Sequence, residues 1–421
     1  MKDAIALDSS HVTKILLTES VFCAIKLRLG RDEQLQKIRV LFPYVEAGYG
    51  HIMPMKSILD SFTKKYGDKV EVVSVRFYAD SGDSHLVKYE QMISRQVRLY
   101  NKVPFIGHLG TFADEFFGAY LSSFGALRII TPFAYSHGVK HMRELAPDVV
   151  ISTHWATNYY AKHLKKDEMP LTIMYCPDAQ LNKLFEYPSD LNLISAPYGY
   201  LRALRKRKYN MDNMKMVPFF IRNEAFSVST DKKALREKLG LPVDKLTIVL
   251  AEGGYGIGKI EPITKLLIKE HIPLTVISIC GTNKKLHEKM LGFECTDEVT
   301  FKPMGFADNI LELEAASDIF CGKAGNILGE STFFGNPSIV THCANMIEHN
   351  ICDHYMNTVG CTIKEYSPKK VVKIVKNFVN NPELLEPYRK RALAYHENFG
   401  SEAAADVIFE KIAEVYPDLK K

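Results

Sequence analysis

Residues 304–350 form the most informative part of the chain and read MGFADNILELEAASDIFCGKAGNILGESTFFGNPSIVTHCANMIEHN. A helix pattern at 309–316 leads to a short apolar strand at 319–321, and the turn 322–325 opens a second helix at Asn326. That helix stops at a Gly-Asn-Pro sequence, and the strand 338–340 follows. Strand, glycine turn, helix and strand make a βαβ unit, so the predicted fold class is α/β.

The glycine turn in this stretch indicates an anion site. It frees backbone N–H groups at the start of a helix, where the helix dipole also favours negative charge. Asn326 and Glu330 are four residues apart and therefore share one face of the helix beside that site. A nucleoside diphosphate suits this arrangement, with the carboxylate accepting hydrogen bonds from ribose hydroxyls. An ordinary turn with an exposed glutamate is the simpler interpretation of the local pattern alone.

The order of the motif residues resembles one glycosyltransferase family. This family includes monogalactosyldiacylglycerol synthases, bacterial diacylglycerol glucosyltransferases and the peptidoglycan N-acetylglucosaminyltransferase. Its members carry G-F-x-D-N-x-x-E-L-x-x-x-x-D ahead of K-x-G and a helical glutamate. The matching residues here are Gly305, Phe306, Asp308, Asn309, Glu312, Leu313, Asp318, Lys323, Ala324, Gly325 and Glu330. The resemblance extends over residues 40–395 and implies the GT-B arrangement, two Rossmann-like domains that face each other across a cleft.

Length and composition set broader limits. A chain of 421 residues is too long for one hydrophobic core, so two domains are expected. The net charge of +5 does not indicate nucleic acid as a partner, although it permits attraction to an anionic membrane surface. The 8 cysteines show no CxxC pair, so buried thiols in a reducing compartment are expected. Neither a membrane-spanning run nor a signal peptide is predicted.

The family resemblance, together with the length of the chain, implies four parts. Residues 1–36 form an N-terminal extension, in which helical spacing of apolar positions beside basic residues permits an interfacial membrane helix. A helix packed on the domain or a loose arm explains the extension more simply. Residues 37–220 form the acceptor-binding domain and 221–400 the nucleotide-sugar-binding domain, both Rossmann-like. The helix in 401–421 could cross back to the first domain.

The first predicted strand, 38–44, leads into a glycine-rich loop and a helix with proline in its first turn. This order places His51 at a helix start that faces the crevice of an open α/β sheet. The family has a glycine-rich loop ending in histidine at this place. The resemblance therefore implies that Gly48 and Gly50 lie at the acceptor and that His51 acts as a base. A structural histidine is about equally well supported by the local pattern.

Two later strands of the first domain also end in polar residues. His154 closes a P-D-x-x-I-S-x-H segment like that of the family, which implies a place on the acceptor side. Asp178 follows the strand 171–175 and is the second candidate base. The residue before it is Pro177, where lipid-glycosylating members have threonine. The acceptor site therefore differs from that of these members.

The segment that precedes the strand ending at His154 is basic and aromatic. Residues 86–102 are expected to form a basic helix, and 105–135 are dense in phenylalanine and tyrosine. Core helices are the plainer interpretation, and an apolar acceptor channel or membrane-facing patch is the alternative. A second basic run lies at 198–208. Peripheral association with the cytoplasmic face of an anionic membrane is the expectation.

The second domain begins its glycine loop after the predicted strand 246–251. The loop contains G-x-x-x-x-G-K, but Ile260 stands where a P-loop needs a magnesium-binding hydroxyl. Backbone approach to a sugar diphosphate is the better interpretation, and the family has G-G-x-G-x-G here. The C-G-x-N-x-x-L sequence at 280–286 is another family signature. The implied donor-binding residues are Gly253, Gly254, Gly281, Asn283, Gly305, Phe306, Lys323, Ala324, Gly325, Asn326, Glu330, Glu348 and Asn350.

The resemblance implies an inverting glycosyltransferase that moves a hexose from a UDP-sugar to a lipid acceptor such as diacylglycerol. His51 or Asp178 takes the acceptor proton, and no cofactor or obligatory metal is expected. Met346 and Ile347 depart from the family pattern P-G-Q-E-E-x-N, which leaves the sugar open. The alternatives are a glycosyltransferase with another acceptor, a sugar-nucleotide epimerase and an inactive sugar-nucleotide-binding protein. A P-loop nucleotidase is disfavoured by Ile260.

Overall fold

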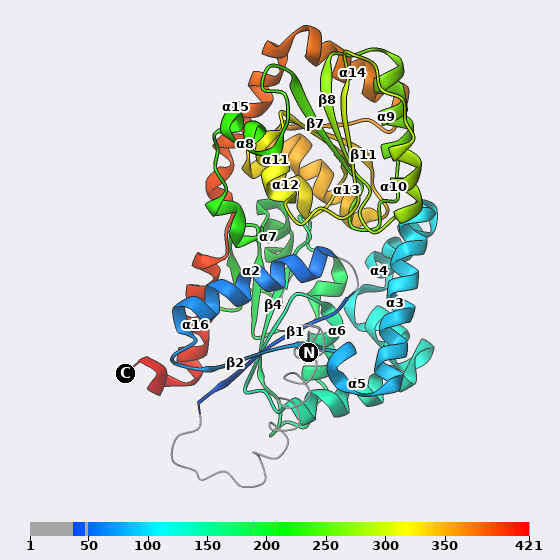
Figure 1. The fold of residues 1–421 in the computed structure, drawn as a ribbon. Coiled ribbons are helices and arrows are strands. Elements are labelled where there is room, and N and C mark those ends of the chain that lie inside the picture. The colour runs from blue at the N-terminus through cyan, green and yellow to red at the C-terminus, as the bar shows by residue number, and fades with distance from the viewer. Residues whose placement is uncertain (1–36, 47–48, 188, 207, 421) are drawn as a thin grey trace, which may run out of the picture.

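Two parallel β-sheets divide the molecule into two halves (Figure 1). The computed structural model describes residues 37–46, 49–187, 189–206 and 208–420. The predicted α/β class with two Rossmann-like sheets is confirmed. The predicted extension 1–36 lies outside the described residues.

The first half contains a 6-stranded sheet with the order β2-β1-β3-β4-β5-β6. Its four central strands are largely apolar and buried, as expected for parallel strands covered on both faces, whereas the two edge strands carry polar and exposed residues. They are β1 (Arg39–Tyr44), β2 (Glu71–Arg76), β3 (Val149–Ser152), β4 (Leu171–Cys176), β5 (Leu191–Ile194) and β6 (Met214–Met216). Its helices are α2 (Tyr49–Tyr66), α3 (Ser84–Lys102), α4 (Pro104–Phe124), α5 (Pro132–Leu145), α6 (Trp155–Ala161) and α7 (Pro197–Leu204).

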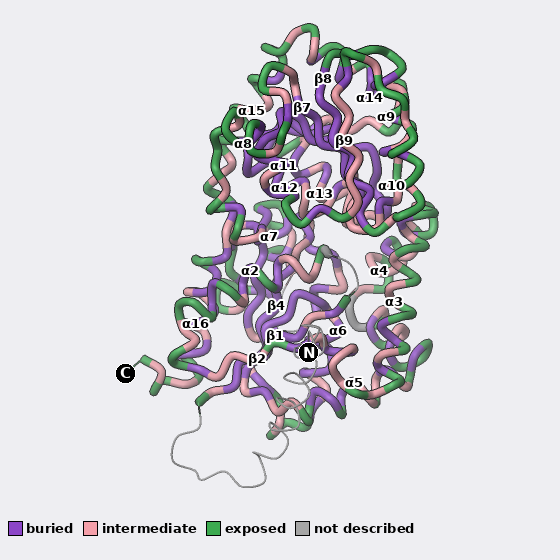
Figure 2. The backbone as a smooth tube through the Cα atoms, viewed as in Figure 1, coloured by how far each residue is buried: buried purple, intermediate pink, exposed green. Residues whose placement is uncertain are grey.

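The second half repeats the design with the strand order β12-β11-β10-β7-β8-β9. Its strands are β7 (Leu246–Ala251), β8 (Leu274–Ile279), β9 (Thr300–Met304), β10 (Ile319–Lys323), β11 (Ser338–His342) and β12 (Thr362–Lys364). Its helices are α8 (Lys232–Leu239), α9 (Ile260–Lys269), α10 (Lys284–Leu291), α11 (Ile310–Ala316), α12 (Asn326–Phe333), α13 (Met346–Asp353), α14 (Pro368–Asn380) and α15 (Glu386–Ala394). Buried apolar side chains pack on both faces of each sheet, and Figure 2 shows that much of the backbone inside each half belongs to buried residues.

The last helix, α16 (Glu402–Val415), packs against α2 in the first half (Figure 1). The rings of Tyr66 and Phe409 stack with centroids 3.9 Å apart. Ser401, at the start of α16, is buried and hydrogen-bonds Ser57 of α2 and the linker residue Asn223. The chain therefore passes between the halves twice, once before β7 and once before α16.

Helices α3 and α4 stand beside the first sheet and reach the second half (Figure 1). Thr111 of α4 accepts a hydrogen bond from the backbone N–H of Met346 at 3.1 Å. Asn101 of α3 accepts one from the Lys323 ammonium at 2.5 Å. Among the described residues, no helix is both long and apolar enough to cross a membrane.

Candidate functional site

In both sheets, the candidate residues lie where the order of the strands reverses. In the first sheet the chain runs from β1 to β2 on one side and then returns to β3 on the other. In the second sheet β7 is flanked in the same way by β8 and β10. Ligands of open α/β sheets bind at the carboxyl ends of strands where the order reverses. His51 and Thr153 follow β1 and β3, while the two glycine turns follow β7 and β10.

His51 lies in the first turn of α2 and is held by the loop after β3. Its Nδ1 is 2.8 Å from the carbonyl oxygen of Thr153, and the Thr153 hydroxyl donates to the His51 carbonyl at 2.8 Å. A carbonyl can only accept, so Nδ1 carries the proton and Nε2 keeps the lone pair. Burial lowers the pKa of His51 below its ordinary value, although the Thr153 hydrogen bond opposes this. The imidazole is therefore neutral near pH 7 and basic at Nε2.

His154 is a buried neighbour of His51. The two rings meet edge to face with centroids 4.9 Å apart, and the ring of Phe185 lies 6.1 Å from that of His51. The His154 Nδ1 accepts from the Ala156 N–H and so caps α6. Burial, and secondarily the nearby His51, hold the pKa of His154 well below its usual range. His154 therefore supports the wall of the site as a neutral, capping side chain.

Asp178 follows β4 and reaches the second half of the molecule. One carboxylate oxygen accepts from the Gln180 N–H at 3.0 Å and from the Asn350 amide at 3.5 Å. The other oxygen is buried and has no hydrogen-bond partner among the described residues. Burial raises the pKa of Asp178 to about 6. The structure thus brings Asp178 together with Asn350, whereas His51 is paired with Thr153.

The glycine loops of the second half pack backbone against backbone. Gly281 has a φ of 58°, and a Cβ there would lie 2.4 Å from the carbonyl oxygen of Gly254. The Thr282 N–H donates to that same carbonyl at 2.8 Å, and the Asn283 amide donates to Gly256 at 3.1 Å. Gly281 and Asn283 therefore hold the loop after β7 in place.

Open backbone lies beside the two turns that were predicted to bind the diphosphate. At Gly253 and Gly325, no described atom comes within 4 Å of the position that a Cβ would take. Gly253 has a φ of 71°, a conformation that glycine adopts without strain. Gly325 caps the start of α12 without a side-chain hydrogen bond to that helix. Both turns can be approached closely by a ligand.

Lys323 and Glu348 form a charged pair at the end of β10. Their Nζ and Oε1 atoms are 2.7 Å apart, and Lys323 also donates to Asn101 of the first half. The other Glu348 oxygen accepts from the Ala344 N–H at 2.7 Å. The predicted donor residues Lys323 and Glu348 are thus joined directly, and the first half contacts them.

Glu330 lies one turn into α12 and is held by a linker arginine. Its two oxygens accept from Arg222 Nε and Nη2 at 2.7 and 2.6 Å. The Glu330 side chain is only 3% exposed. Glu314 lies nearby, and burial together with the charge of Glu330 raises its pKa well above the usual range. Arg222 was not among the predicted site residues, because only the folded chain brings the linker to α12.

Glu252 is a second residue that the sequence pattern did not reveal. It ends β7 just before the glycine loop, is 2% exposed and accepts from the Thr341 hydroxyl at 2.7 Å. Its other oxygen has no hydrogen-bond partner among the described residues. Burial raises the pKa of Glu252 to about 7. The sequence signal for Glu252 was a charged residue directly before a glycine loop. The local pattern does not show that this residue is buried.

The remaining predicted residues take varied positions. Lys259, the lysine of the G-x-x-x-x-G-K sequence, donates to the carbonyls of Thr341 and Tyr366, so it anchors the loop. The carbonyl of Gly305 accepts from Gly281, and Phe306 is 52% exposed. Gly50 lies exposed in α2, and Asn326 begins α12. Gly48 lies outside the described residues. Ala324 is fully buried.

Curated relatives of this chain are glycosyltransferases. The chain is 22% identical over 383 residues to a processive diacylglycerol beta-glucosyltransferase from Bacillus pumilus, covering 89% of this chain and 95% of the relative. It is 26% identical over 201 residues to the UDP-N-acetylglucosamine--N-acetylmuramyl-(pentapeptide) pyrophosphoryl-undecaprenol N-acetylglucosamine transferase of Clostridioides difficile, covering 45% and 48%. No family model matches the chain. The predicted family resemblance and the prediction of a glycosyltransferase enzyme are confirmed.

Solved structures share the two-sheet architecture. MurG from Acinetobacter baumannii superposes with a TM-score of 0.55 at 14% identity, covering 89% of this chain and 99% of that one. A UDP complex of S. aureus MnaA gives 0.57 at 16% identity, covering 91% and 98%. A Listeria monocytogenes protein assigned as a UDP-N-acetylglucosamine 2-epimerase also gives 0.57, at 12% identity with the same coverage. These likenesses confirm the GT-B fold.

Proposed function

We propose that this protein is an inverting glycosyltransferase that moves a hexose from a UDP-sugar to a lipid acceptor such as diacylglycerol. One observation carries the proposal: a neutral, fixed imidazole lies at the strand-order reversal of the first sheet, and two open glycine turns lie at that of the second. The contacts of Asp178 with Asn350 and of Lys323 with Asn101 join the two edges. A base and a diphosphate site on facing edges are what sugar transfer requires.

In this proposal the donor lies on the second half. Backbone N–H groups at Gly253, Gly254, Gly325 and Asn326 receive the diphosphate, where the start of α12 adds its dipole. Glu330 accepts hydrogen bonds from the ribose while Arg222 holds the carboxylate in orientation. A carboxylate has about four lone-pair sites, so the two hydrogen bonds from Arg222 leave capacity for the ribose hydroxyls. The backbone N–H groups of the two glycine turns also stabilise the negative charge that develops on the UDP leaving group.

The proposed chemistry is a single displacement. The acceptor hydroxyl oxygen attacks the anomeric carbon, the bond from that carbon to the UDP oxygen breaks, and UDP leaves with the electron pair. Nε2 of His51 takes the hydroxyl proton, since the carbonyl of Thr153 keeps Nδ1 protonated. The displacement inverts the anomeric configuration. The two halves exclude water, which would otherwise compete as acceptor.

Asp178 is the rival base, and its geometry supports a different role. It is fully buried, whereas His51 is partly exposed. Its link to Asn350 connects the acceptor side with the donor side. We therefore assign His51 as the base and Asp178 as a positioning residue that holds the two halves in register.

The proposed lipid acceptor is supported by the surface of α4. The side of this helix that faces the protein carries Thr111 and Glu115, which bind Met346 and Arg202. Large apolar side chains are exposed along α4, among them Phe105 at 76% and Phe116 at 72%. Exposed apolar area of this kind marks membrane or partner sites. The proposed location is the membrane surface, where a diacylglycerol acceptor is found.

Product analysis tests this proposal. The full chain is incubated with UDP-glucose or UDP-galactose and diacylglycerol vesicles, and the lipid fraction is examined by mass spectrometry and proton NMR. The expected product is a monohexosyl lipid whose anomeric configuration is opposite to that of the donor. A product with retained configuration contradicts the single displacement. Sugar transfer to water or to a polar acceptor, with none to lipid, contradicts the lipid acceptor.

A sugar-nucleotide epimerase is the second candidate, because the epimerase assignment belongs to a structure with a TM-score of 0.57 over 91% of this chain. The distinguishing experiment omits the acceptor. An epimerase converts UDP-N-acetylglucosamine to its 2-epimer without lipid, whereas the proposed transferase leaves the sugar nucleotide unchanged. Appearance of the epimer would replace the proposed transfer reaction.

A further inference from the structure

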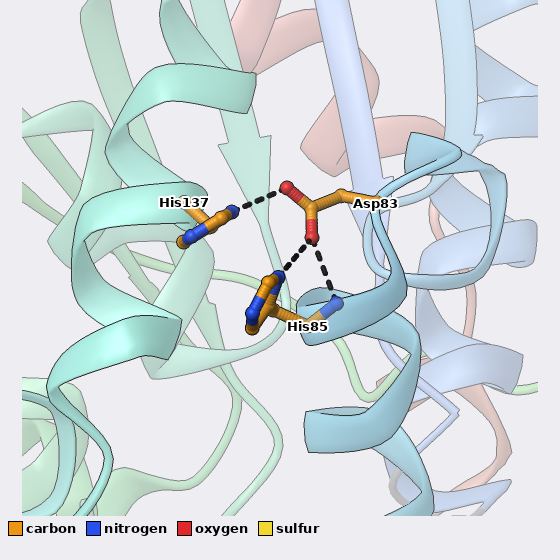
Figure 3. Close-up of side chains that lie close together, drawn as sticks. All are labelled: Asp83, His85 and His137. Carbon is orange, nitrogen blue, oxygen red and sulfur yellow. Dashed lines mark hydrogen bonds and ion pairs between the residues drawn. The ribbon is translucent and has the colours of Figure 1, made fainter.

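Two histidines and one aspartate converge at a place that the proposed reaction does not use. Asp83 and His85 lie at the start of α3, just after the short helix η1 (Ala79–Ser81), and His137 lies in the first half of α5. Figure 3 shows the two imidazole rings facing the Asp83 carboxylate from different helices. One ligand atom from each of the three side chains lies within 4.8 Å of the others.

The contacts show that both imidazoles present the same nitrogen to the carboxylate. His137 Nδ1 contacts Asp83 Oδ2, and His85 Nδ1 lies 3.3 Å from Asp83 Oδ1. The two ring centroids are 4.3 Å apart. Side-chain exposure is 25% for Asp83, 31% for His137 and 56% for His85, so an ion could enter from solvent. The cluster is thus small, preformed and accessible.

We propose that Asp83, His85 and His137 bind a divalent transition-metal ion, with Zn²⁺ as the best fit. Imidazole nitrogen with one carboxylate oxygen suits zinc, whereas magnesium and calcium prefer oxygen ligands throughout. Each imidazole offers a ring-nitrogen lone pair and Asp83 offers a carboxylate oxygen, so the three side chains together provide three zinc ligands. Solvent supplies the fourth ligand of a tetrahedral zinc ion at the exposed side of the cluster.

The position of the site indicates that a bound metal ion links helix α3 to helix α5. Helix α3 has 19 residues and spans about 28 Å at 1.5 Å per residue. Two of the proposed ligands, Asp83 and His85, lie at its start, and Asn101, which contacts Lys323, lies at its other end. The site is therefore far from the interdomain edge. By linking the start of α3 to α5, the ion holds in place the end of α3 that lies away from the second half. Helices α3 and α4 together carry the exposed apolar residues.

Metal binding to the full-length chain tests the proposal. The protein is freed of metal with a chelator and titrated with Zn²⁺ by calorimetry, while Co²⁺ serves as a spectroscopic probe of tetrahedral nitrogen and oxygen ligands. One Zn²⁺ per chain and a zinc-dependent rise in Tm are expected. His137→Ala should lose this site, with an affinity loss exceeding the 10–100-fold that outer-shell partners cost.

Two further variants keep the result interpretable. Asp83→Asn still caps α3, since asparagine caps helices about as well as aspartate, so the metal-free protein should keep its Tm while zinc affinity falls. His271→Ala is the matched control, because His271 faces the single carboxylate of Glu298 at 3.3 Å and should leave the zinc site intact. Absence of zinc binding to the wild type overturns the proposal, and so does unchanged binding in His137→Ala.

Discussion

At the scale of single residues, the protonation state of His51 controls the proposed reaction. Its pKa is lowered by burial, so the neutral form persists to a lower pH than in a free histidine. A base must be unprotonated, so activity is lost as the pH falls through that lowered pKa. We expect kcat/KM for sugar transfer to decline with a midpoint below 6.5, the ordinary histidine value. Initial rates measured from pH 4.5 to 8.5 check this.

His51→Ala should remove that acidic limb and reduce the transfer rate by about 10²–10⁴-fold. Asp178→Asn is the comparison, since the pKa of Asp178 is about 6 and its ionisation affects the same pH range. If the limb persists in His51→Ala but disappears in Asp178→Asn, Asp178 is the base. Acting as one unit, the two residues should give losses that do not add in the double variant.

Glu330 carries the prediction for donor binding. Glu330→Ala should weaken UDP binding by about 1–3 kcal/mol, the usual cost of losing a charged hydrogen-bond partner. The variant also leaves Arg222 without its partner, and breaking a buried ion pair costs about 3–5 kcal/mol of stability. Arg222 is 21% exposed, so the lower end is expected. Calorimetry with UDP measures the first effect and urea unfolding the second.

Glu312→Ala is the matched control for that experiment. Glu312 lies on the neighbouring helix α11 and pairs with Lys238 at 2.7 Å, and the two side chains are 30% and 64% exposed. Its removal should change neither UDP affinity nor stability by more than about 0.5 kcal/mol. Equal UDP affinity for Glu330→Ala and the wild type would show that Glu330 serves only the ion pair.

At the scale of elements, local sequence patterns were sufficient for the units around the site. The strand, glycine turn and helix expected at 319–326 appear as β10 and α12, since a buried apolar run is followed by a glycine turn that ends at the N-cap residue Gly325. The partners of the site residues could not be predicted. Arg222 meets Glu330, and Asn350 meets Asp178, across sequence separations of 108 and 172 residues. A local sequence pattern does not show which distant side chain will contact a given site residue.

Helix α4 shows where the pattern left two interpretations open. Its aromatic density was compatible with a core helix or with a membrane-facing patch, because hydrophobic residues occur in both. Much of the apolar surface of α4 is exposed, while polar Thr111 faces the protein. This orientation depends on how α4 packs against its neighbours, and no periodicity within α4 defines it. The exposure of these apolar side chains favours the membrane-facing patch.

Substitution on α4 tests the membrane proposal. Replacing Phe105 and Phe116 by aspartate should weaken binding to anionic vesicles, since each inserted ring contributes about 1.5–3 kcal/mol and the added charges are repelled. UDP affinity should stay unchanged, because neither residue belongs to the donor site. Vesicle flotation at low and high salt provides the measurement. Leu291→Asp, at a 62% exposed position of α10, is the control that should still bind.

At the scale of the whole molecule, α16 connects the second half to the first by packing against α2. Phe409 is 9% exposed and stacks on Tyr66 of α2. Phe409→Ala should lower the free energy of unfolding by about 3–5 kcal/mol, the usual cost of removing a buried aromatic ring. Val415→Ala on the same helix, where the side chain is 49% exposed, should have little effect. A comparable, small loss in both variants would show that α16 contributes little to stability.

In the proposed reaction the two halves act together, with the base on the first and the donor on the second. The most direct test follows UDP release from a UDP-sugar, with and without diacylglycerol vesicles, for the wild type and His51→Ala in parallel with UDP calorimetry. We expect acceptor-dependent UDP release by the wild type, a loss of about 10²–10⁴-fold in His51→Ala, and equal UDP affinity in both. Acceptor-dependent release by His51→Ala at the wild-type rate would contradict the proposed reaction.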